Sequence, residues 1–206
     1  GLGLRIMTTA STIPISTESE APWQLPYRGT VGMVCLIVAE AAIFAIFFVS
    51  YIFYMGKSLT GPTPREVLEL PILGTICLLS SSITVHWAVS ALRKENIRGC
   101  TLGLASTVLL GGIFMVTTAQ EWYHLIYEKG LTIRTNLFGT TYYSLVGLHA
   151  THVIVGLIML SIALFVALTG RIKEEHSEKL EVLSLYWHFV DAIWVGVFLV
   201  VYVIGR

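Results

Sequence analysis

Charged residues are scarce in this chain of 206 residues. Lys, Arg, Asp and Glu make up 13% of it, whereas an average soluble domain carries about 25%. The 13 basic and 13 acidic side chains balance to a formal net charge of zero. Neither nucleic acid nor an acidic partner is therefore expected to bind.

Cysteines are also few, and they are widely spaced. Cys35, Cys77 and Cys100 each lie in or beside a different apolar run. No pair has the C-x-x-C spacing that could hold copper or an iron–sulfur centre. We interpret all three as small apolar core residues.

The usual signatures of catalysis are missing. The sequence contains no Walker loop, no Rossmann glycine pattern, no nucleophile elbow and no zinc-binding H-E-x-x-H motif. No catalytic residue, metal site, redox centre or nucleophile is therefore expected in this chain.

Long apolar runs dominate the chain after residue 30. They predict an all-α, polytopic membrane bundle of five transmembrane helices, since each run can cross about 30 Å of hydrocarbon. The first run is too long for a secretory signal, so no cleaved signal is expected. A polar N-terminal segment, residues 1–30, precedes the membrane domain of residues 31–206. The predicted spans are residues 31–54, 70–92, 99–121, 140–168 and 182–204.

Basic residues in the loops predict the orientation. Eight Lys and Arg residues fall on the side of the N-terminal segment and of the second and fourth loops, and five fall on the other side. The positive-inside rule then places the N-terminus inside and the C-terminus outside.

Glu40 is the most informative residue, because an acid deep in a bilayer is costly and is usually retained for a function. It lies about 14 Å into the first span. Its neighbours on the helix face are apolar, and no partner lies within one turn of the same helix. We therefore expect a buried, largely protonated carboxyl that exchanges protons. The structural alternative is a neutral acid bonded to a backbone carbonyl or to another helix.

Four more polar residues lie at similar depths in the last two spans. His149 and His152 are spaced i, i+3, as are His188 and Asp191, so each pair shares a helix face. We expect the two pairs to face each other in an intramembrane hydrogen-bonded network. The alternative is haem ligation by His152 and His188.

Three residues are expected near the membrane surfaces. Glu121 and Trp122 at the outer end of the third span fit an interfacial belt. His86, near the inner end of the second span, could collect protons, although a solvated side chain is the simpler interpretation.

Several motifs together resemble one family. Y-W-H-F-V-D-A-I-W (residues 186–194) is similar to the signature of subunit III of haem–copper terminal oxidases such as cytochrome c oxidase. G-L-H-A-T-H-V-I-V-G (residues 147–156) and A-E-A-A-I-F (residues 39–44) resemble two further segments of that family. L-E-L-P-I-L-G-T, S-S-S-I-T-V-H-W-A and A-Q-E-W also match, in the family's order, and the resemblance covers about residues 28–206.

The resemblance implies a function in aerobic respiration. It implies a non-redox subunit of a proton-pumping cytochrome c oxidase, in the five-helix form found in the bacterial inner (plasma) membrane. Haem and copper are then expected in partner subunits and not in this chain. The implied partners are subunit I directly, subunit II and other oxidase subunits, together with membrane lipids, including bound phospholipid.

The resemblance also gives Glu40 a role, since it matches the family's carbodiimide-reactive acid. The family's subunit is thought to support proton uptake and to stabilise the catalytic subunit. The alternatives are the same subunit in a quinol oxidase or nitric oxide reductase, a haem-bearing membrane anchor, or a proton-coupled transporter. A transporter should show inverted repeats, and none is evident.

Overall fold

Helices form all of the regular structure in the described part of the chain. The computed structural model describes residues 28–57, 68 and 70–205, and it contains no strand within them. The membrane-length helices are α1 (Arg28–Tyr54), α3 (Ile72–Arg93), α4 (Ile97–Tyr127), α5 (Leu137–Leu168) and α6 (Ser177–Val197), which continues into η2. Five helices are thus long and apolar enough to cross a membrane. The all-α, five-span prediction is confirmed, and residues 1–27 lie outside the described residues.

Two short elements adjoin α6. The 3₁₀ turn η1 (Glu174–His176) precedes it, and the π-helix η2 (Phe198–Ile204) follows without a break. The wider π-helical turn changes the direction in which the last side chains project. Tyr202 lies within this turn.

Local signals explain where the helices begin and end. Asn136 precedes α5, and its side-chain oxygen accepts a hydrogen bond from the backbone N–H of Gly139 at 2.7 Å. Such a cap satisfies one of the N–H groups that the first helical turn leaves free. Beyond the other end of α5, Gly170 adopts φ 67°. This left-handed conformation suits glycine and ends the helix.

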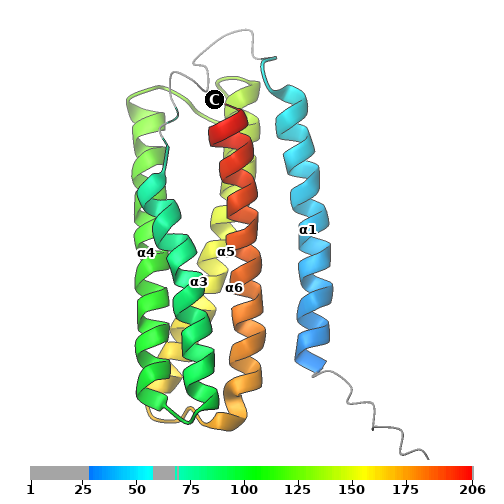
Figure 1. The fold of residues 1–206 in the computed structure, drawn as a ribbon. Helices are drawn as coiled ribbons and strands as arrows, with labels where there is room; N and C mark the ends of the chain where they lie inside the picture. Colours follow the sequence, from blue (N-terminus) through cyan, green and yellow to red (C-terminus); the bar gives the residue numbers. More distant parts are fainter. Residues whose placement is uncertain (1–27, 58–67, 69, 206) are drawn as a thin grey trace, which may run out of the picture.

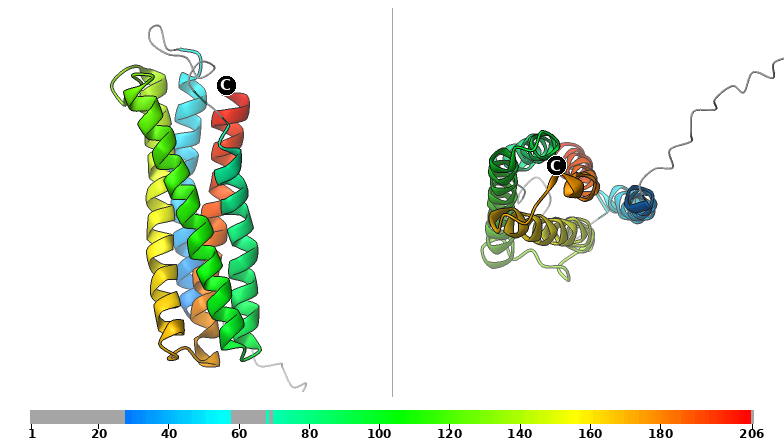
Figure 2. Two further views of the ribbon diagram at one scale, coloured as in Figure 1. Left: turned by 90° about the vertical axis from the view of Figure 1, so that its left-hand side faces the viewer. Right: turned by 90° about the horizontal axis from the view of Figure 1, so that it is seen from below.

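The helices form a four-helix bundle with one helix outside it. Seen end-on, α3, α4, α5 and α6 enclose a common interior, and α1 stands beside α5 and α6 (Figures 1 and 2). The largest fully buried side chains include Trp187, Trp194, Tyr142 and Tyr202. Only Phe44 and Tyr51 of α1 are buried, so most of this helix remains available to lipid or to another subunit.

Small residues bring α3 and α4 into close contact. A Cβ atom placed on Gly103 of α4 would lie 2.8 Å from the Cβ of Ala88 on α3 and 3.0 Å from its backbone. Membrane helices associate through such close approaches, because lipid supplies no hydrophobic drive between them.

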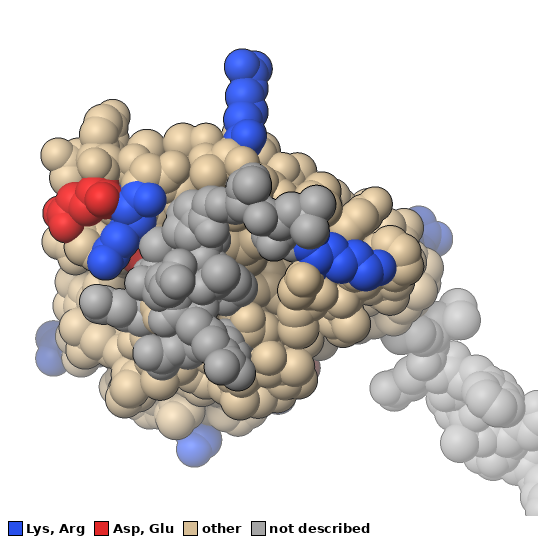
Figure 3. Space-filling model, turned by 90° about the horizontal axis from the view of Figure 1, so that it is seen from above, with Lys and Arg blue, Asp and Glu red and all other residues tan. Residues whose placement is uncertain are grey.

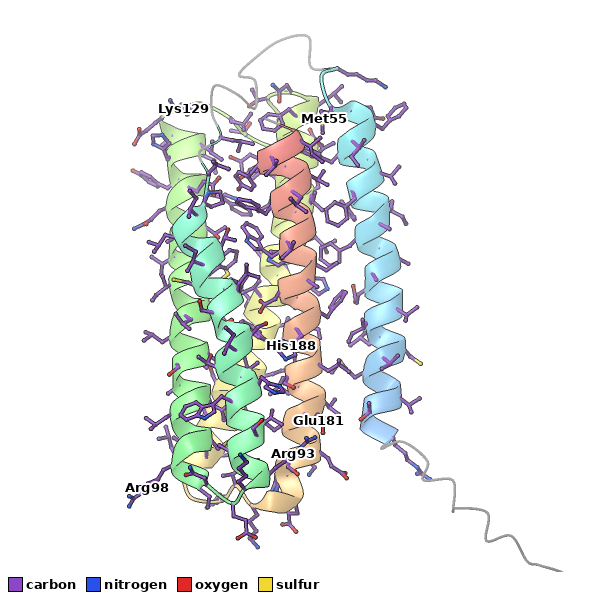
Figure 4. All side chains as sticks on the ribbon, viewed as in Figure 1. Met55, Arg93, Arg98, Lys129, Glu181 and His188 are labelled. Carbon is purple, nitrogen blue, oxygen red and sulfur yellow. The ribbon has the colours of Figure 1, made fainter. Side chains whose placement is uncertain are left out.

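The two ends of the bundle differ in charge. Seven described Lys and Arg residues lie at the helix ends and turns of the lower end, where Figure 4 labels Arg93 and Arg98. The seven are Arg28, Arg93, Lys94, Arg98, Arg171, Lys173 and Lys179. The upper end carries Lys57, Lys129 and Arg134. Figure 3 looks down on this upper end, where the basic side chains stand apart from one another and an acidic side chain lies beside one of them.

Candidate functional site

Glu40 has a partner, and that partner comes from another helix. The Oε2 atom of Glu40 on α1 lies 3.1 Å from Nε2 of His152 on α5. The Glu40 side chain is 25% exposed and that of His152 13% exposed. The predicted partners of the His152 side chain, His188 and Asp191, are therefore wrong, because its Nε2 bonds Glu40 instead.

A second hydrogen bond fixes the tautomer of His152. Its Nδ1 lies 2.8 Å from the carbonyl oxygen of Leu148. A carbonyl only accepts, so Nδ1 must carry a hydrogen. Nε2 then either accepts a hydrogen bond from a neutral Glu40 or donates one to an ionised Glu40. Both arrangements contain one shared proton and have no net charge.

The pair borders a shallow groove between α1 and α5. The groove has a volume of about 280 Å³ and is lined mainly by apolar side chains, with Tyr186 at one side. The ring of Phe44 lies 5.0 Å from the imidazole of His152, centroid to centroid. The pair therefore lies at the edge of the bundle among mainly apolar side chains.

His188 and Asp191 form a separate cluster with Ser82 of α3. The hydroxyl of Ser82 donates to Oδ2 of Asp191 and lies 3.0 Å from Nδ1 of His188. Ser82 has one hydrogen, so with that hydrogen given to Asp191 the imidazole donates to Ser82. The Asp191 side chain is deeply buried, since the residue is only 4% exposed.

The predicted network between the last two spans is therefore replaced by two sites. The i, i+3 spacing placed each pair on one face of its helix, but it did not determine which helix that face meets. α6 turns His188 and Asp191 toward α3, whereas α5 turns His152 toward α1.

His149 contacts aromatic rings instead of polar groups. It is 1% exposed, and its ring stacks on Trp194 with centroids 5.1 Å apart and an interplanar angle of 28°. Neither ring nitrogen has a hydrogen-bond partner among the described residues. The predicted bonding of His149 to the last span is thus wrong, and its contact there is a ring-stacking one.

The third cluster lies at the upper end, where two buried tyrosines meet Glu121. Oε1 of Glu121 accepts from the hydroxyl of Tyr202 at 2.8 Å and from that of Tyr142 at 3.3 Å. The sequence predicted a solvated interfacial carboxylate at Glu121. In the structure, this carboxylate accepts hydrogen bonds from two buried tyrosines. Only a comparison of depths in the antiparallel helices α5 and α6 could have suggested the two tyrosines.

His86 and Trp122, the two other residues predicted near the membrane surfaces, differ in exposure. His86 is exposed on α3. Trp122 is half-buried, and its ring meets that of Tyr143 with centroids 5.4 Å apart. Within the described ranges, no three His, Cys, Asp or Glu side chains gather in a way that could hold a metal ion.

Together, the five spans and the polar groups inside them define a multi-pass helical membrane protein with titratable side chains between its helices. Comparison with known proteins identifies the family. The family profile described as "Cytochrome c oxidase subunit III" matches residues 27–206. The chain therefore belongs to the cytochrome c oxidase subunit III family.

Individual relatives agree with the family match. The chain is 34% identical to "Cytochrome c oxidase subunit 3" of Alkalihalophilus pseudofirmus, over 81% of this chain and 82% of that protein. It is 36% identical to the Synechocystis sp. protein of the same name, over 84% and 74%. For the Bacillus sp. (strain PS3) protein of that name, identity is 31% over 96% and 95%.

Family membership sets the function at the level of the complex. The function of this chain is that of subunit III of a cytochrome c oxidase, within an oxidoreductase complex of the respiratory chain that contains other oxidase subunits. The quinol oxidase, nitric oxide reductase and transporter alternatives are not favoured.

Proposed function

We propose that this chain is a non-catalytic subunit in which Glu40 and His152 act together as a proton-exchanging site. The observation that carries the proposal is the 3.1 Å contact between Glu40 Oε2 and His152 Nε2 beside the groove between α1 and α5. This distance is within the range required for direct proton transfer between side chains. The family resemblance, in which Glu40 matches the carbodiimide-reactive acid, supports the same assignment.

The pair suits proton exchange better than a lone carboxyl would. When Glu40 gives its proton to His152, the imidazolium remains bonded to the carboxylate, so the new charges offset each other. The proton therefore moves inside the pair at less cost than it would leave an isolated acid in apolar surroundings. Tyr186 adds a contact, since its hydroxyl donates to the backbone carbonyl of His152 at 3.4 Å.

The placement in the complex and the membrane is part of the proposal. We place haem and copper in partner subunits, with subunit I in direct contact and subunit II nearby. The excess of Lys and Arg at the lower end supports an orientation with that end and the N-terminus inside and the C-terminus outside. Resemblance to the five-helix bacterial form supports a bacterial plasma membrane, and the apolar groove suits a phospholipid acyl chain.

The test is Glu40→Gln in the intact oxidase complex. The amide of glutamine can still donate a hydrogen bond to Nε2 of His152, but it cannot release a proton at accessible pH. We expect oxygen consumption to slow, or inactivation during turnover to quicken, at high pH where protons are scarce. Haem content should be unchanged, because Glu40 is not a haem ligand in this proposal.

The matched control is Glu175→Gln, which makes the same chemical change on an exposed residue after α5. Its oxygen consumption should follow the wild-type curve at every pH. If the Glu40→Gln curve also overlaps the wild type, with equal lifetime during turnover, then Glu40 is only a structural hydrogen-bonding group.

A further inference from the structure

A continuous series of oxidisable rings crosses the upper part of the bundle. Successive centroid separations are 5.4 Å from Trp122 to Tyr143, 5.1 Å from Tyr143 to Tyr142, 6.5 Å from Tyr142 to Tyr202 and 6.2 Å from Tyr202 to Trp194. The rings come from α4, α5, η2 and α6 in turn. Adjacent rings at these separations are in direct contact.

The carboxylate of Glu121 lies where this series is most buried. Tyr142 is 0% and Tyr202 2% exposed, and their hydroxyl oxygens are 3.1 Å apart. Tyr202 donates to Oε1 of Glu121 at 2.8 Å, which is within proton-transfer range. A buried phenol can lose an electron only at high cost unless its proton leaves with the electron, because the radical cation is strongly acidic and poorly solvated.

We propose that Trp122, Tyr143, Tyr142, Tyr202 and Glu121 form a one-electron relay that ends in a protected tyrosyl radical at Tyr202. An oxidising radical takes an electron from Trp122, which is half-buried and nearest the surface. The electron that refills Trp122 comes from Tyr202 and tunnels across the rings of Tyr142 and Tyr143, which remain neutral phenols. As this electron leaves, the O–H bond of Tyr202 breaks and its proton binds Oε1 of ionised Glu121.

The net reaction balances. One oxidant gains one electron, Tyr202 becomes a neutral radical, and the Glu121 carboxylate becomes a carboxylic acid. A one-electron reductant reverses each step, since the returned electron and the proton on Glu121 regenerate the phenol. The cytochrome c oxidase complex handles oxygen, so oxygen-derived radicals are the chemical class of oxidant that this relay would intercept.

Packing alone does not explain why positions 142 and 202 carry tyrosine hydroxyls. Phe138 and Phe198 contact the same tyrosines, with centroids 5.7 Å from Tyr142 and 5.9 Å from Tyr202, and they fill the space around them without a polar atom. What phenylalanine could not supply is the pair of hydroxyls directed at one carboxylate oxygen.

The experiment uses the whole oxidase complex and a defined oxidant. A ruthenium tris-bipyridine sensitiser with persulfate as electron acceptor generates Ru(III) on illumination, and the sample is frozen for electron paramagnetic resonance. We expect the wild type to give a tyrosyl signal that is lost in part in Tyr202→Phe and in Glu121→Gln. In both variants, oxidised products of Trp122 should increase in peptide mass spectra, because Tyr202 no longer returns an electron to the oxidised Trp122 ring.

The matched control is Tyr127→Phe, which removes the hydroxyl of a 73% exposed tyrosine outside the series. It should leave Trp122 oxidation at the wild-type level. The proposal is overturned if Tyr202→Phe matches the wild type in both tyrosyl signal and Trp122 oxidation, or if Trp122 is not oxidised in any sample. A purely structural role for Tyr202 would change thermal stability without changing either readout.

Discussion

The contact between α3 and α4 offers the sharpest test of how this bundle is packed. A Cβ on Gly103 would lie 2.8 Å from the Cβ of Ala88 and 3.0 Å from both its Cα and its backbone nitrogen. Two of these atoms are backbone and cannot rotate away, so Gly103→Ala must push the helices apart. Overpacking of this kind costs about 1–3 kcal/mol.

Gly112 provides the matched control on the same helix. A Cβ there would meet nothing within 4 Å. Replacing either glycine with alanine also gains helix propensity, about 1 kcal/mol in a helix interior. That gain is common to Gly103→Ala and Gly112→Ala, so the difference between the two variants isolates the steric cost.

The assay is a titration of the purified complex with SDS. The measured quantity is the fraction of this subunit that has dissociated from the remaining subunits. We expect the Gly103→Ala variant to be less stable than the Gly112→Ala variant by the overpacking cost of about 1–3 kcal/mol. A difference of 1–3 kcal/mol corresponds to about a 5–150-fold change in the equilibrium. If the two variants lose the subunit at the same SDS concentration, the helices can separate freely and the close contact does not stabilise the bundle.

Two further stability predictions concern polar groups. Asn136→Ala should destabilise the chain by about 0.5–2 kcal/mol because α5 loses its N-terminal cap, and Asn136→Asp, measured by the same SDS titration, should retain most of the stability. Ser82→Ala should cost about 1–3 kcal/mol because Asp191 and His188 lose a buried partner. A titration curve for Ser82→Ala that coincides with that of Ser106→Ala, an exposed serine hydroxyl bonded only within its helix, would contradict the second prediction.

The contrast between the Glu40 and Asp191 sites bears on how the subunit works. Glu40 is reachable from a groove at the edge of the bundle, whereas Asp191 is enclosed by α3 and α6. A carboxyl that exchanges protons needs a route to its surroundings, and Glu40 borders such a groove. The buried Ser82–Asp191–His188 cluster is better suited to joining α3 to α6 through hydrogen bonds.

Much of this protein was determined by sequence alone. Five apolar runs of about 20 or more residues indicate helices, because backbone polar groups in lipid must be bonded and a helix bonds them within its own segment. The rarity of ionisable residues in such runs made Glu40 and Asp191 conspicuous. The ordered motifs around residues 39–44, 147–156 and 186–194 indicated the family that the comparisons identify.

The tertiary structure decided which residues meet. A hydropathy pattern and an i, i+3 spacing define the depth and the face of a side chain, but the rotation of each helix about its axis depends on how all the helices pack. For that reason His152 could be assigned a depth but not its partner Glu40. Glu121 likewise gained its two tyrosines only because the antiparallel helices α5 and α6 bring Tyr142 and the π-helical turn at Tyr202 to the end of α4, a contact between distant segments that no local pattern encodes.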